Sequence, residues 1–160
     1  MQDNKPPLKG LPFPDPDAPK PLPSKYTPPI DISKVTNEKD VKSICKKLLD
    51  HFGWFWWMPG ASGFGTQGVH DFCCLKDGVF LTVETKFGKN TPTPVQRSFA
   101  RHVMANSAIA LVVNESNIDH LFWFLESFDA SVARRLGGQK VEADHGSRML
   151  NALAALTDGW

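Results

Sequence analysis

The fold is decided by residues 69–86, VHDFCCLKDGVFLTVETK. Two apolar runs meet at Asp77 and Gly78, and an Asp-Gly pair between β-type runs is a strong signal for a two-residue hairpin turn. With these two residues in the turn, Lys76 pairs with Val79. The stretch therefore predicts a β-hairpin whose register is set by its turn.

The two faces of this predicted hairpin differ in chemistry. The apolar face carries Phe72, Cys74, Val79, Leu81 and Val83. On the other face Asp71 lies opposite Glu84, and Lys86 shares that face because it is two residues farther along the strand. Opposed carboxylates destabilise a sheet unless a cation holds them, and Mg²⁺ commonly binds one or two carboxylates together with waters and phosphates. The pattern indicates either a divalent-metal site or the ordinary solvated face of a hairpin.

A longer set of residues extends this pattern toward a known family. Asp71, the triplet Glu84-Thr85-Lys86 and Gln96 at a helix start resemble the PD-(D/E)xK nuclease superfamily. The resemblance is to its VRR-NUC and Holliday-junction-resolvase-like branch, which is common in phage genomes. It spans roughly residues 36–113 and includes the glycine-rich loop before Asp71.

The resemblance implies an α/β fold with a restriction-endonuclease-like αβββαβ core, in which helices flank a mixed sheet. One residue departs from the family pattern, because His70 stands where the family usually has proline. That proline shapes the backbone and binds no metal, so the implied site is retained. His70 directly precedes Asp71, and we expect it to point to the opposite face in a packing or hydrogen-bonding role.

The resemblance also implies a binding site for Mg²⁺ or Mn²⁺. Asp71 and Glu84 would hold the ion, with the backbone carbonyl of Thr85 as a further ligand. Glu38, on the predicted first helix, resembles the acidic residue that often joins this site in the family. Helical periodicity points Glu38 toward the sheet, although the helix dipole alone also favours a glutamate in a first turn.

Lys86 and Gln96 are the implied catalytic residues. Lys86 would orient the attacking water and offset the charge that builds on the phosphate, while Gln96 would orient the water or a phosphate oxygen. Gln96 also has a purely structural interpretation, because Thr93, Pro94 and Gln96 have the spacing of a capping box. The candidates for contact with DNA are Lys89, Arg97 and Arg101, which could equally face water.

The chain is expected to contain three parts. Ten of the thirteen prolines fall in residues 1–35, an extended arm that acts as a spacer or docks a protein partner. Residues 36–128 form the nuclease-like core, and residues 129–160 form a C-terminal helical extension. The expected helices cover 36–53, 117–128 and 147–156, with another from Thr93, and the strands outside the hairpin cover 54–58 and 109–113. The wide apolar stripe of 118–128 predicts burial against the C-terminal segment or in a homodimer interface.

Composition limits the remaining possibilities. The net charge of +1 gives no strong basic field, which argues against non-specific coating of DNA but not against a nuclease. Cys45, Cys73 and Cys74 lie in apolar elements without zinc spacing, so we expect them to be reduced and buried. We find no signal peptide and no apolar run long enough for a membrane, which predicts a cytoplasmic protein of a bacterium or of a phage-infected host.

These observations predict a divalent-metal-dependent nuclease that hydrolyses phosphodiester bonds in DNA, as an endonuclease or a junction-resolvase-like enzyme, and that is phage-encoded. The alternative is a non-cleaving module on the same fold that binds nucleic acid or protein. A module of that kind would have no reason to keep Asp71, Glu84 and Lys86 together.

Overall fold

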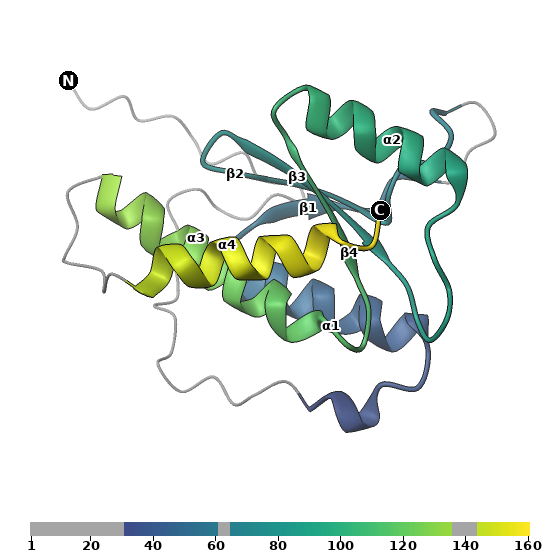
Figure 1. Cartoon of the computed structure of the whole chain (residues 1–160), viewed down its shortest axis with the longest axis horizontal. Coiled ribbons are helices and arrows are strands. Elements are labelled where there is room, and N and C mark those ends of the chain that lie inside the picture. Colours follow the sequence, from purple (N-terminus) through teal and green to yellow (C-terminus); the bar gives the residue numbers. More distant parts are fainter. Residues whose placement is uncertain (1–30, 61–64, 136–143) are drawn as a thin grey trace, which may run out of the picture.

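The computed structural model describes residues 31–60, 65–135 and 144–160, without the side chains of Ile32, 130–135 and 144–148 (Figure 1). The proline-rich segment up to residue 30, part of the glycine-rich loop (61–64) and the segment 136–143 lie outside the described residues. Our expectations for those three segments therefore stay predictions.

The described elements follow the order expected from the sequence. They are α1 (Glu38–His51), β1 (Phe55–Trp57), β2 (Phe72–Lys76), β3 (Val79–Thr85), α2 (Pro94–Ala105), β4 (Ile109–Val113), α3 (Ile118–Arg135) and α4 (Asp144–Thr157). The sheet has the order β1-β2-β3-β4, with antiparallel pairs up to β3 and a parallel pair between β3 and β4. The restriction-endonuclease-like αβββαβ core with a mixed sheet flanked by helices is thus confirmed, and two further helices follow it.

The hairpin of β2 and β3 has the predicted turn and register. Asp77 and Gly78 have φ angles of 49° and 81°, and a type I′ turn requires positive φ at both central residues. Lys76 pairs with Val79, and the pairing continues to Phe72 opposite Val83. The local turn chemistry therefore sets which side chains share each face of the sheet.

The two faces of the sheet are covered unequally. Helices α1, α3 and α4 pack on one face around the main apolar core, whereas α2 covers the other face with a small core of Ala100, Val103 and Ala110 (Figure 1). The hydrophobic effect accounts for the larger layer, since the apolar face of the hairpin contributes Phe72, Cys74, Leu81 and Val83 to it. The face that carries Glu84 is the one under α2, and it is buried there instead of solvated.

Three details differ from the sequence prediction. A short 3-10 helix, Ile32–Lys34, precedes α1 where extended chain was expected, because the Asp31 carboxylate accepts hydrogen bonds from the backbone N–H (3.2 Å) and hydroxyl of Ser33. Helix α3 continues past residue 128 to Arg135, and α4 begins at Asp144, before residue 147. These two helices pack along each other, and such tertiary contacts lengthen helices beyond their apolar pattern.

The apolar stripe of α3 is buried within the chain. Ile118, Leu121, Leu125 and Phe128 join the main core together with Ala152 and Leu156 of α4. Burial against the C-terminal segment, one of the two expectations for this stripe, is therefore confirmed. The three cysteines are free and buried, as expected. Among the described residues, no helix has the length and hydrophobicity that crossing a membrane requires.

Candidate functional site

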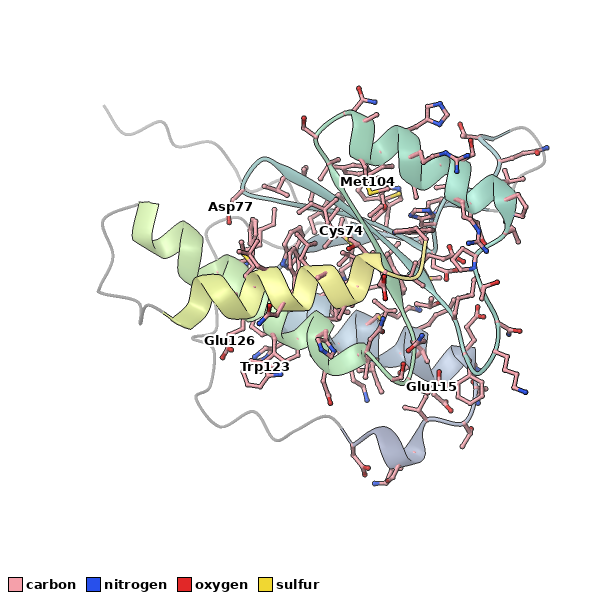
Figure 2. The ribbon with its side chains drawn as sticks, in the orientation of Figure 1. Cys74, Asp77, Met104, Glu115, Trp123 and Glu126 are labelled. Atoms are coloured by element: carbon pink, nitrogen blue, oxygen red, sulfur yellow. The ribbon has the colours of Figure 1, made fainter. Side chains whose placement is uncertain are left out.

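The candidate site begins where β2 and β3 stop pairing. The last paired residues are Phe72 and Val83, so the backbone N–H of Thr85 has no partner on β2. Asp71 replaces that partner, because its Oδ2 accepts hydrogen bonds from Thr85 N (3.0 Å) and from the Thr85 hydroxyl. Backbone donors in a protein interior need such an acceptor. The arrangement fixes the Asp71 carboxylate at the end of β3, away from the turn (Figure 2 shows Asp77 at the turn and Glu115 beyond the other end of the sheet).

Glu84 is the most deeply buried charged group of the site, with a side chain only 2% exposed. Its Oε1 accepts hydrogen bonds from Lys86 Nζ and from Gln96 Nε2, the latter at 2.7 Å. Its Oε2 is buried and has no hydrogen-bond partner among the described residues. Five buried side-chain polar atoms of the described residues lack a partner, and Glu84 Oε2 is the one carboxylate oxygen among them. An unpartnered buried carboxylate oxygen is costly, so Oε2 is a candidate to accept a water or to bind a cation.

The electrostatics of Glu84 follow from its surroundings. Burial is the main cause that raises the pKa of Glu84, a hydrogen bond from Lys86 lowers it, and the negative charge of Asp71 raises it further. The two carboxylates are therefore close enough to repel each other. A cation between them would favour the ionised form of both.

Gln96 forms the predicted capping box and also contacts Glu84. Thr93 Oγ1 accepts a hydrogen bond from Gln96 N (3.3 Å), and Gln96 Oε1 accepts one from Thr93 N (2.8 Å), which forms the capping box of α2. The amide nitrogen at the other side of the same group donates to Glu84. The first turn of α2 is thus joined directly to the candidate metal ligand.

His70 supports this connection from the same side of the sheet. Its Nδ1 lies 2.8 Å from the hydroxyl of Thr82, its Nε2 lies 3.2 Å from the carbonyl oxygen of Gln96, and its ring stacks on Trp160 at 4.6 Å between centroids. His70 lies against Thr82 and Phe99 on the α2 side of the sheet, whereas Asp71 contacts Thr85 and Lys42 of α1, so His70 points away from Asp71 as expected. The expected packing and hydrogen-bonding role is present. Burial lowers the pKa of His70 to about 4, so the ring is neutral at pH 7.

Lys42 of α1 is a site residue that sequence reasoning missed. Its Nζ lies 3.0 Å from Glu38 Oε1 and 2.9 Å from Asp71 Oδ1, so one ammonium joins both carboxylates. Burial opposes its charge, but hydrogen bonds to Asp71 and Glu38 outweigh burial and raise the pKa of Lys42. The available signal was its position four residues after Glu38, a spacing that puts two side chains on the same helix face.

The remaining predicted residues lie around this group. Glu38 is at the first turn of α1 and engages Lys42. Arg97 is half-buried and donates to the carbonyl oxygen of Pro92 (3.1 Å), whereas Lys89 and Arg101 are exposed. Across the described residues, no three His, Cys, Asp or Glu side chains gather closely enough to hold a metal together. A cation at Asp71 and Glu84 would therefore complete its shell with backbone oxygens, waters or substrate.

Comparison with known proteins gives limited information. No family model matches the chain, and no curated protein sequence matches it. A solved structure described as a VRR_NUC domain is similar, with 24% sequence identity and a TM-score of 0.46 over 54% of this chain and 94% of that one. With that identity and TM-score the match carries no argument about activity, which has to rest on the geometry of the site.

Proposed function

We propose that this protein is a divalent-metal-dependent nuclease that hydrolyses phosphodiester bonds in DNA, with endonuclease or junction-resolvase-like action. The observation that carries the proposal is the buried Oε2 of Glu84 beside Asp71, an oxygen that has no partner within residues 31–60, 65–135 and 144–160. Buried carboxylate oxygens without a hydrogen-bond partner are uncommon in proteins, and this one is available to bind a cation.

The donor set fits a hard divalent cation. Glu84 Oε2 has its lone pairs free, and Asp71 Oδ1 accepts one hydrogen bond, from Lys42, so it retains a second acceptor position. Oxygen ligands of this kind suit Mg²⁺ or Mn²⁺, and the nearby Cys45 thiol is buried in the apolar core. Asp71 and Glu84 would hold the ion, with the Thr85 carbonyl as the proposed backbone ligand. When bound, such an ion polarises a phosphate and lowers the pKa of a coordinated water.

The other residues of the site would act on the substrate and on the water. Lys86 carries a positive charge beside Glu84, where it would orient the nucleophilic water and offset negative charge on the phosphate during attack. Gln96 would keep Glu84 Oε1 occupied, so that Oε2 is the oxygen turned to the ion. Lys89 and Arg101 are exposed and would contact the DNA backbone. Arg97 would act indirectly, because its hydrogen bond to the carbonyl oxygen of Pro92 holds the loop before α2 in place.

The test is cleavage of supercoiled plasmid, linear duplex and a four-way junction with Mg²⁺, Mn²⁺ or EDTA. We expect metal-dependent cutting by the wild type and none by Glu84→Gln, which keeps the shape of the side chain and removes its charge. Glu126→Gln is the matched control, because Glu126 is a half-buried glutamate on α3, a helix without site residues. No cutting by folded wild-type protein on any substrate would reject the proposal, and DNA binding without cutting would favour the non-cleaving module.

A further inference from the structure

We infer that the ammonium of Lys42 takes the place of a second metal ion, so that each chain binds one divalent cation, at Asp71 and Glu84. This inference rests on the proposed function and adds to it the number of ions and a positioning role for Lys42. Its starting point is the bridge that Lys42 Nζ forms between Glu38 Oε1 (3.0 Å) and Asp71 Oδ1 (2.9 Å). A cation shared by two carboxylates would contact the same two oxygens.

The acceptor capacity of Asp71 supports one ion. A carboxylate has about four lone-pair positions. Two positions on Oδ2 accept the N–H and hydroxyl of Thr85, and one on Oδ1 accepts Lys42. One position on Oδ1 remains, which is enough for a single cation that also binds Glu84. A second ion would have to displace Lys42 in order to reach both Glu38 and Asp71.

The charges of the site lead to the same number. Glu38, Asp71 and Glu84 contribute three negative charges, and Lys42 and Lys86 contribute two positive ones. The site without metal therefore has one excess negative charge, which attracts a cation. One divalent ion changes that excess to one positive charge, which suits a phosphate. A second divalent ion would add two more positive charges next to the Lys42 ammonium, and the like charges would repel.

The position of Lys42 also explains how Asp71 stays in place without metal. Lys42 ties the Asp71 carboxylate to α1, while Thr85 ties the same carboxylate to β3. The ammonium thus holds one metal ligand in its binding position and gives Glu38 a partner other than the metal. Glu38 then acts through Lys42 and does not contact the ion.

The experiment is the stoichiometry of Mn²⁺ binding, measured by equilibrium dialysis and by the electron paramagnetic resonance signal of free Mn²⁺. We expect one Mn²⁺ per wild-type chain and none at this site in Glu84→Gln. Lys42→Met removes the charge and keeps the side-chain length, so we expect it to bind two Mn²⁺ per chain. The double variant Glu38→Gln with Lys42→Met should bind one again, because the second ion needs Glu38.

Two controls keep the result interpretable. Lys47→Met removes an exposed lysine of the same helix and should still bind one Mn²⁺. Lys42→Arg keeps the charge and should also bind one, and thermal unfolding shows which variants are folded. If Lys42→Met does not fold, Lys42→Gln and the wild-type count decide the question.

The possible outcomes separate the inference from the proposed function. Two Mn²⁺ per wild-type chain, or one in folded Lys42→Met, would overturn the inference and leave the metal-dependent nuclease standing. No Mn²⁺ bound by the wild type would overturn both.

Discussion

The two ends of the β2–β3 hairpin each bury a lysine beside a carboxylate, and they differ in how completely the pair is satisfied. At the turn, Lys76 Nζ pairs with Asp129 of α3 and donates to the carbonyl oxygen of Phe52. The Asp129 side chain is 25% exposed, so water reaches its carboxylate. At the other end, Glu84 is 2% exposed and pairs with Lys86 through Oε1, while Oε2 has no partner among the described residues. The first pair is complete within the described fold, whereas the second leaves Glu84 Oε2 free for a water or a cation.

The largest expected effect is a difference in kcat for DNA cleavage between variants of Lys86 and Lys76. Lys86→Met should lower kcat for DNA cleavage about 10²–10³-fold, the usual loss when one group that stabilises developing charge is removed. Lys76→Met should leave kcat unchanged, since Lys76 lies at the turn and contacts α3 and Phe52. Single-turnover cleavage rates with saturating Mg²⁺ provide the measurement. Equal losses in both variants would show that the ends of the hairpin do not differ in function.

The second effect tests whether the Glu84–Lys86 end of the hairpin binds the ion. Mg²⁺ at 100 times its Kd should stabilise the wild type by about 2.7 kcal/mol, because a ligand that binds only the folded state adds its binding free energy. The same increment should appear in Lys76→Met and disappear in Glu84→Gln. Urea unfolding with and without Mg²⁺ measures it. An equal increment in Glu84→Gln would place the ion away from Glu84.

The third effect concerns the Lys76–Asp129 pair at the turn of the hairpin. Lys76→Met should lower the free energy of unfolding by about 1–3 kcal/mol, because it leaves the carbonyl oxygen of Phe52 and the half-buried Asp129 without their donor. The midpoint of urea denaturation without metal gives the value. A Lys76→Met protein as stable as the wild type would mean that this pair contributes nothing to the fold.

The smallest effect concerns the capping box that joins α2 to Glu84. Thr93→Ala should lower the free energy of unfolding by about 1 kcal/mol, a typical cost of losing an N-cap side chain. It should also lower kcat slightly, since the backbone N–H of Gln96 loses its acceptor on Thr93 and the first turn of α2, which holds the Gln96 amide against Glu84, is held less firmly. Thr93→Ser keeps the cap and should restore both quantities. Loss of stability with unchanged kcat would show that the cap does not position Gln96.

Much of the fold could be predicted because its signals are local. The Asp77-Gly78 turn set the register of the hairpin, and the spacing of Thr93 and Gln96 predicted the cap. Each of these features depends on residues that are close in the chain.

Parts of the candidate site could not be predicted, because they depend on how distant elements pack. Strand alternation put Asp71 on the face of Glu84, but Asp71 precedes β2 and its carboxylate contacts Thr85 and Lys42 of α1. Alternation also could not show that α2 buries the face of Glu84. The partners of His70 also depend on the packing of distant elements. Its ring is held by Thr82, Gln96 and Trp160, which lie on three different segments.

The sequence by itself determined the elements, the hairpin register and the residue types that meet at the open end of β3. Only the tertiary structure decided that Lys42 of α1 reaches Asp71 and that Glu84 Oε2 has no partner among the described residues. Periodicity identifies a face, but the docking of helices on the sheet decides what covers it and which donors come within reach. Whether a buried oxygen has a hydrogen-bond partner depends on donors from several distant elements, and no local sequence pattern specifies all of them.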